Sequence, residues 1–321
     1  MYNLFLLITL LFAASSYADE LPGNASKSHK LIQVVTTFSV LSDLVKQIGG
    51  EHVEVYSLVG WDEDAHVFHP SPSAVKKLAR ADLLIVNGLG FEGWLDRLVS
   101  VAQYKGVLQI ASEGIDAIHL EGRDKHEHHG HDEGEGHGDD HEGGGRGSKV
   151  FDPHAWLSLK AVRHYLTNIS SALQALDPNR VDYYRDRAQQ YSSLLNELER
   201  SIDSRFSAIP QNRHVVIPHN AFAYLARDYG LHIHSLKGLS TESESSAAQI
   251  ARTIREIRSN NIRAIFSENI VNSRIIETIT RETGVKFGGN LISGALSKEI
   301  APTYLAMMRH NANLLIAALE R

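Results

Sequence analysis

The segment "LIQVVTTFSVLSDLVKQIGGEHVEVYSLV", residues 31–59, contains the pattern that indicates the fold class. Its apolar run at residues 31–38 predicts a buried strand, and residues 39–50 predict a helix that ends at two glycines. Residues 53–59 predict a second strand. A strand, a helix and a strand in so short a space indicate a parallel pair joined by a helical crossover.

The same alternation of strands and helices recurs in the rest of the first half of the chain and again in the second half. Residues 71–81 predict a helix with Pro72 in its first turn, where the missing N–H costs nothing, and residues 81–88 predict the next strand. In the second half, two apolar runs each lead into a helical pattern: 214–219 into 221–230, and 263–269 into 273–284. The predicted fold class is therefore α/β, with parallel sheets flanked by helices.

A long helical pattern separates the two halves. Residues 177–207 carry apolar or aromatic side chains at helical spacing over seven to eight turns, which is longer than most globular helices. We expect a rigid connector between an N-terminal lobe, residues 19–176, and a C-terminal lobe, residues 208–321. The cleft between two such lobes is the natural place for a ligand.

The first 18 residues predict a signal peptide. "MYNLFLLITLLFAASSYA" is an apolar run that ends in a small-x-small pattern, and it is too short to remain as a membrane span. The chain contains no cysteine, which a lipid anchor or a disulfide would need. We therefore expect a soluble periplasmic protein that is not a lipoprotein.

Residues 121–147 form the most biased segment. They contain nine acids, three bases and nine glycines, so their formal charge of -6 equals that of the whole chain. This composition predicts a flexible loop. The loop has six histidines, which we expect to bind metal weakly as an accessory site: His126, His128, His129, His131, His137 and His141. The rest of the chain is about neutral and has no basic face for nucleic acid.

Three isolated histidines carry the stronger signal. His66, His154 and His219 each follow a predicted strand, at the edge where ligands bind in open α/β folds. A single histidine there is usually a hydrogen-bonded loop residue, but these three come from both halves. Three neutral imidazoles suit a borderline-soft ion such as Zn²⁺, with N–Zn distances of about 2.1 Å. By contrast, "HIH" at residues 232–234 is interpreted as strand, and His69 as a loop residue.

Four motifs resemble the zinc/manganese solute-binding proteins of bacterial ABC importers. They are "DAHVFHPSPSAVKKLARADLLIVNGLGFEGWL", "DPHAW", "PHNAFAYLARDYGL" and "TYLAMMRHN", and they cover nearly the whole mature chain. The resemblance implies two lobes bridged by a long helix, with an ion bound between them by His66, His154 and His219. Manganese-type members have a carboxylate at the third position, so His219 favours Zn²⁺ over Mn²⁺.

The sequence departs from this family at the fourth ligand. Many members have an aspartate where this chain has Gly294, and glycine has no side chain to coordinate. The fourth position is left to water, to Glu268 or to a histidine of the loop. Glu268 is alternatively an acceptor that orients a ligand histidine, and Asp152 is either such an acceptor or a helix N-cap.

The predicted function is high-affinity periplasmic Zn²⁺ binding and delivery to an ABC permease in the inner membrane. The protein is expected to be a monomer without enzymatic activity, and a metal-donating chaperone is a further candidate partner for the loop. Two alternatives stay open. One is a zinc-dependent hydrolase with an open water position on the metal and Glu268 as its general base; the other is a zinc buffer without a permease.

Overall fold

The computed structural model describes residues 30–120, 150–242 and 245–320. The predicted signal peptide and the predicted histidine-rich loop lie outside the described residues. From Leu31 onward the chain forms one compact unit. No helix among the described residues has both the length and the apolar character needed to cross a membrane.

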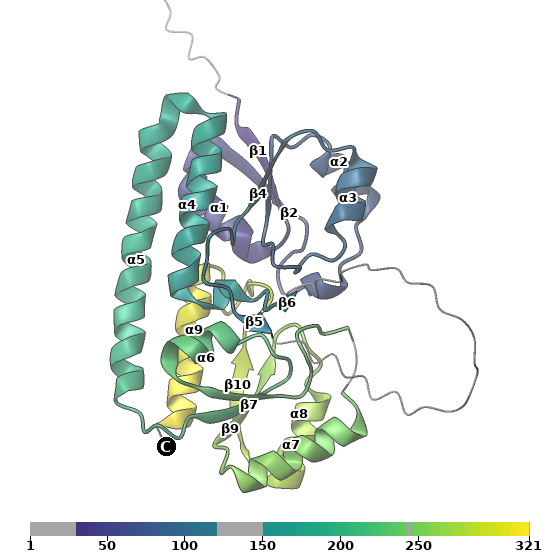
Figure 1. Cartoon of the computed structure of the whole chain (residues 1–321), viewed down its shortest axis with the longest axis vertical. Coiled ribbons are helices and arrows are strands. Elements are labelled where there is room, and N and C mark those ends of the chain that lie inside the picture. The colour runs from purple at the N-terminus through teal and green to yellow at the C-terminus, as the bar shows by residue number, and fades with distance from the viewer. Residues whose placement is uncertain (1–29, 121–149, 243–244, 321) are drawn as a thin grey trace, which may run out of the picture. The chain divides into compact units, whose positions relative to one another are not determined.

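Two four-stranded parallel sheets form the framework, and this confirms the predicted α/β class (Figure 1). The first sheet has the order β2-β1-β3-β4 and consists of β1 (Ile32–Thr36), β2 (Val53–Ser57), β3 (Leu83–Val86) and β4 (Val107–Ile110). The second has the order β10-β9-β7-β8 and consists of β7 (His214–Ile217), β8 (His232–Ser235), β9 (Ala264–Glu268) and β10 (Lys286–Leu291). A two-stranded antiparallel ribbon joins β5 (His119–Leu120) to β6 (Val150–Phe151).

Nine helices among the described residues surround these sheets. They are α1 (Ser39–Gly49), α2 (Pro72–Leu78), α3 (Leu95–Ala102), α4 (Leu159–Leu176), α5 (Val181–Ser207), α6 (Ala223–Tyr229), α7 (Ala247–Ser259), α8 (Arg274–Thr283) and α9 (Tyr304–Leu319). Ser71 caps α2 as its side chain accepts from the backbone N–H of Ala74, and Pro72 occupies the first turn as predicted.

Alternating side chains of the first sheet face two different layers. Val34 and Ile85 belong to the core shared with α1 and α4, whereas Val35 and Leu84 pack with Leu78 of α2 on the opposite face. Because successive residues of a strand point to opposite faces, a strand that is apolar at every position must be covered on both sides. The adjacent apolar pairs Val34–Val35 and Leu84–Ile85 therefore specify strands in the interior of the sheet.

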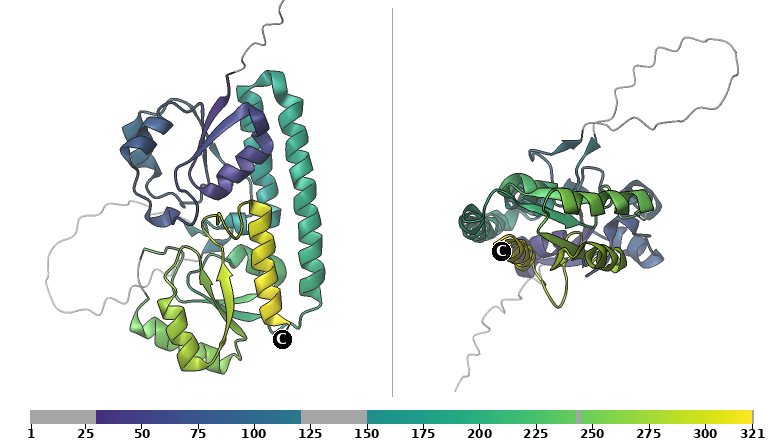
Figure 2. Two further views of the ribbon diagram at one scale, coloured as in Figure 1. Left: turned by 180° about the vertical axis from the view of Figure 1, so that it is seen from behind. Right: turned by 90° about the horizontal axis from the view of Figure 1, so that it is seen from below.

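The second sheet is built in the same way. Val215 and Phe266 face the core that includes α6 and α9, and Val216 and Ile265 pack against α7 and α8, for example on Ile257. Figures 1 and 2 show α7 and α8 on one side of this sheet and α9 on the other.

The long helix predicted at residues 177–207 is present as α5. It starts four residues later, at Val181, because Pro178–Arg180 forms a separate 3-10 turn. In both side views α5 runs beside the two sheets from one end to the other (Figures 1 and 2). Its buried residues, such as Tyr184 near the start and Phe206 near the end, belong to one continuous hydrophobic core.

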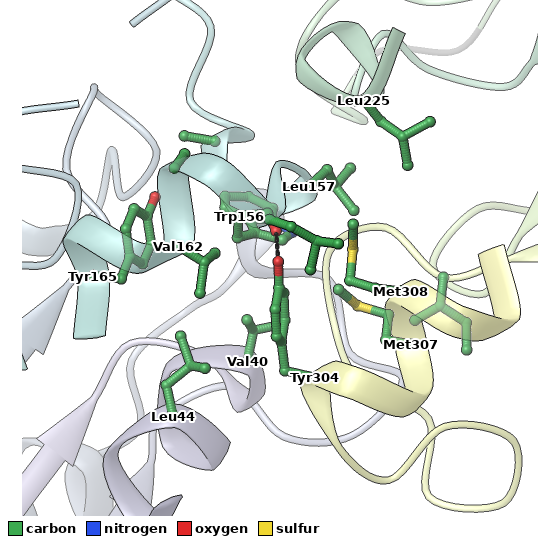
Figure 3. Close-up of a cluster of buried hydrophobic side chains, with 14 of the residues drawn as sticks. Val40, Leu44, Trp156, Leu157, Val162, Tyr165, Leu225, Tyr304, Met307 and Met308 are labelled. Carbon is green, nitrogen blue, oxygen red and sulfur yellow. Dashed lines mark hydrogen bonds between the residues drawn. The ribbon is translucent and has the colours of Figure 1, made fainter. Parts of the chain in front are cut away.

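That core joins the two halves through Trp156 and Tyr304, both of which are fully buried (Figure 3). The Tyr304 hydroxyl donates to the Trp156 carbonyl at 2.8 Å, and the Trp156 indole N–H donates to the Ser293 carbonyl at 2.7 Å. The backbone N–H of Tyr304 donates to the Asp43 carboxylate at 2.7 Å. Elements of both halves are therefore connected by buried hydrogen bonds as well as by apolar packing.

The Tyr304 hydroxyl gives a test of this connection. We expect Tyr304→Phe to lower the free energy of unfolding by about 1–3 kcal/mol, because the buried Trp156 carbonyl loses its donor. Urea denaturation of the metal-free protein measures the change. Tyr104→Phe is the matched control, since the Tyr104 hydroxyl also donates to a backbone carbonyl, that of Val107, but in an exposed position. An equal loss in the two variants would contradict the structural role of Tyr304.

Candidate metal centre

Three histidines predicted from sequence meet at one point between the two sheets. One nitrogen from each of His66, His154 and His219 lies within 4.8 Å of the others. The closest pair is His66 Nε2 and His154 Nε2, at 3.2 Å. The described residues contain no other such group of three or more histidine or carboxylate side chains.

His66 comes from a short turn after β2, an edge strand of the first sheet. It lies in a 3-10 turn, Ala65–Val67, in which the Asp64 carboxylate accepts from the His66 backbone N–H at 2.9 Å. The Trp94 indole N–H donates to the Ala65 carbonyl at 2.9 Å and fixes the turn from the other side. The His66 ring packs edge-on against Phe91, with centroids 4.9 Å apart.

His154 is fixed by its own neighbour in sequence. The Asp152 carboxylate oxygen Oδ1 lies 2.9 Å from both the His154 backbone nitrogen and its ring Nδ1. Asp152 is therefore the orienting acceptor, and the other interpretation, a helix N-cap, is wrong, since Ser158 caps α4. With a proton on Nδ1, the His154 ring presents the lone pair of Nε2 to the centre.

His219 follows β7, and its partner stands at the end of the adjacent strand β9. The Glu268 carboxylate accepts from the His219 backbone N–H at 3.0 Å, and its second oxygen lies 2.7 Å from ring Nδ1. Both residues are buried. His219 Nε2 is buried without a hydrogen-bond partner among the described residues. An unpaired buried nitrogen beside two other imidazoles is suited to a cation.

The pKa values separate the three rings. Burial lowers the pKa of His66 to about 3, and the nearby His154 and His219 contribute to this. Burial also lowers the pKa of His154, against the opposing effect of Asp152. For His219, burial acts in the same direction, but the Glu268 carboxylate outweighs it and raises the pKa above its ordinary value.

A zinc ion fits this arrangement. Tetrahedral Zn²⁺ with nitrogens at about 2.1 Å needs them about 3.4 Å from one another. The His66–His154 distance of 3.2 Å is close to this value, and the nitrogen of His219 lies within 4.8 Å of both. Glu268 has both oxygens on His219, so neither lies in the group of three. Gly294 is buried and supplies no ligand. His69 is exposed and outside the group.

Sequence reasoning missed the aromatic wall of this centre. Besides Phe91, the Trp156 ring packs edge-on against His154 with centroids 5.2 Å apart. A cavity of about 470 Å³ leads to His66 and is lined by apolar side chains that include Leu89, Phe151 and Leu239. These residues could not be recognised from the sequence, because they are separated along the chain and resemble ordinary core residues.

Comparisons with known proteins match nearly the whole chain. A family model described as "Zinc-uptake complex component A periplasmic" matches residues 34–318. The manganese-binding lipoprotein MntA of Halalkalibacterium halodurans is 30% identical over 323 residues, covering 100% of this chain and 98% of the relative. The iron ABC transporter substrate-binding lipoprotein MtsA of Streptococcus pyogenes is 29% identical, covering 99% and 96%.

Two solved structures support the same relationship. The periplasmic zinc-binding protein TroA from Treponema pallidum is 26% identical with a TM-score of 0.79, covering 91% of this chain and all of TroA. The Mn-bound periplasmic metal-binding protein from Candidatus Liberibacter asiaticus is 27% identical with a TM-score of 0.73, covering 89% and 98%.

These relatives correct the predicted localisation. We expected a protein that is not a lipoprotein, but relatives from Halalkalibacterium halodurans, Streptococcus parasanguinis, Streptococcus mitis and Lactococcus lactis are named lipoproteins. The prediction relied on one compositional feature, the lack of cysteine, and that feature says nothing about where related chains reside. The prediction of an unanchored protein is therefore wrong by this comparison.

The pKa pattern predicts how binding depends on pH. His219 is the one ligand whose pKa is raised, so it carries a proton that Zn²⁺ must displace as the pH falls through that pKa. His66 and His154 stay neutral there. We expect the apparent Zn²⁺ affinity to fall by about tenfold per pH unit, a slope of one proton. Competition titrations with a zinc-sensitive dye between about pH 5 and pH 8 measure this slope.

Glu268→Gln provides the control for that assignment. The neutral amide removes the charge that raises the pKa of His219, so the fall in affinity should begin at a lower pH than in the unmodified protein. A slope of two or three protons in the unmodified protein, or an unchanged onset in the Glu268→Gln variant, would contradict the assignment.

Proposed function

The chain belongs to the zinc-uptake complex component A family, and on this premise we propose that it binds Zn²⁺ through His66, His154 and His219 and delivers it to the permease of an ABC importer. Members of this family are periplasmic metal-binding components of such importers. The single observation that carries the proposal is the convergence of three imidazole nitrogens within 4.8 Å, each from a different segment of the chain.

The donor set supports zinc as the cargo. All three converging atoms are nitrogens, and the two nearby carboxylates, Asp152 and Glu268, are engaged on the outer sides of His154 and His219. Mn²⁺ prefers oxygen ligands, whereas imidazole suits Zn²⁺. The family model is described by zinc uptake, but individual relatives are named for manganese or iron, so the choice of Zn²⁺ rests on the ligand chemistry of this chain.

The same contacts favour capture over the hydrolase alternative. Glu268 was the general-base candidate for a metal-bound water, and a base must reach the proton that it removes. Both Glu268 oxygens contact His219 instead. A base held on the far side of a ligand histidine orients that ligand, which is what tight binding needs.

Unequal burial of the ligands supports a route for the ion. His154 and His219 are fully buried, but His66 is partly exposed and borders the cavity of about 470 Å³. We therefore place entry and release at His66, because its short turn can move without disturbing a strand. We assign the fourth position to water or to a histidine of residues 121–147, since no carboxylate among the described residues belongs to the group of three.

Replacement of single ligands tests the proposal. We expect His66→Ala, His154→Ala and His219→Ala each to weaken Zn²⁺ binding by at least about tenfold, because each removes one of three metal–nitrogen bonds. Isothermal calorimetry with Zn²⁺, and in parallel with Mn²⁺, measures the affinities. His69→Ala is the matched control and should bind as the unmodified protein does. Unchanged tight binding in any of the three variants would rule out that ligand.

Deletion of residues 124–145 tests the role of the histidine-rich segment. If the segment is accessory, the shortened protein should keep one tight Zn²⁺ per chain and lose only weaker equivalents. The reason is that any site in a segment without its own core must offset the entropy of ordering the chain around the ion. Calorimetric stoichiometry gives the answer. Loss of the tight equivalent would show that the segment supplies a fourth ligand.

A further inference from the structure

A second group of histidines lies on the neighbouring strands β7 and β8 of the second sheet. His214 is the first residue of β7 and His232 the first of β8, and the parallel register sets them side by side. His234 shares the face of His232, because side chains two residues apart in a strand point the same way. His214 is five residues before His219, which corresponds to about 16 Å along an extended chain.

The rings of this group are close enough to share an ion. His214 Nδ1 lies 3.0 Å from His234 Nε2, near the separation of about 3.4 Å that two nitrogens adopt on tetrahedral zinc. The His232 ring stacks on that of His214, with centroids 4.5 Å apart and an angle of 15° between the planes. The stacking fixes the plane of the His214 ring.

A carboxylate orients one ring of this group as in the principal site. Glu256 of α7 has its Oε2 3.2 Å from His234 Nδ1, so the proton stays on Nδ1 and the lone pair of Nε2 faces His214. Asp152 fixes His154 in the same way. The Arg252 guanidinium lies 3.6 Å from the other oxygen, Glu256 Oε1, and so leaves Oε2 on the histidine.

We propose that His214 Nδ1 and His234 Nε2 form a second binding site for a borderline divalent transition-metal ion such as Zn²⁺. In the absence of an ion, the Nδ1–H of His214 donates to His234 Nε2. On binding, that proton moves to Nε2 of His214, and the two facing lone pairs bind the ion. Water completes the coordination shell.

Exposure and ligand number distinguish this site from the principal one. His234, Arg252 and Glu256 line an open cavity of about 800 Å³, so an ion reaches the pair from solvent. Two protein nitrogens provide fewer bonds than three, and partly exposed rings are less rigidly held. The second site is therefore weaker, and it fills after the tight equivalent.

Anomalous diffraction tests the site directly. Crystals of the full chain soaked in Zn²⁺ should show a peak within about 2.3 Å of both His214 Nδ1 and His234 Nε2, in addition to one at the principal centre. A peak at the principal centre alone, at a concentration that saturates the weak equivalents in solution, would overturn the proposal. So would a peak that touches neither nitrogen.

Calorimetry of His234→Ala gives a test in solution. This variant should lose one weak Zn²⁺ equivalent and keep the tight one, and the retained tight equivalent also shows that the variant is folded. His164→Ala, which replaces an exposed histidine outside both groups, should lose none. Glu256→Gln should weaken the second site by about tenfold without removing it. An unchanged number of weak equivalents in His234→Ala would overturn the proposal.

Discussion

The metal centre depends on the buried contact between Trp156 and Tyr304. Trp156 follows His154 by two residues, and its indole N–H donates to the Ser293 carbonyl in the second half of the chain. The Tyr304 hydroxyl donates to the Trp156 carbonyl, and the Tyr304 backbone N–H donates to Asp43 of α1. Ligands from both halves are thus fixed to a single close-packed core, in which a displacement of a few tenths of an ångström is costly.

Charge balance explains why the carboxylates stand behind the histidines. A dication bound among these rings would need neutralising charge, and the Asp152 and Glu268 carboxylates lie behind His154 and His219, outside the group of three nitrogens, where they would supply it. Without the ion, a proton on His219 compensates for Glu268, which accounts for the raised pKa of His219 and the lowered pKa of Glu268. Glu268 therefore stabilises His219 both in the protonated, metal-free state and in the metal-bound state. The two states differ in whether His219 carries a proton or a metal ion.

Much of the fold and the three converging histidines could be predicted from the sequence, because both follow from local patterns. Continuous apolar runs predicted central parallel strands, and a histidine after a strand lies at the edge where such folds bind ligands. The elements α3, β4 and β10 were not predicted, since β4 is largely exposed and β10 contains two glycines and a register shift. The choice between two roles for Asp152 required the position of Ser158, which only the folded chain gives.

The contacts within the second histidine group and the burial of both groups could not be predicted from the sequence. "HIH" at residues 232–234 was correctly predicted to be a strand, but its partner His214 is 18 residues away, and only the parallel register of β7 and β8 brings them together. In both groups a carboxylate contacts Nδ1 of one histidine, and Nε2 of that histidine faces a neighbouring ring. The two groups differ in how deeply they are buried. Burial of His154 and His219 removes competing water and fixes geometry, whereas the exposed edge of β8 does neither. Both the number of imidazole nitrogens that converge and the degree to which the core encloses them therefore separate the two groups.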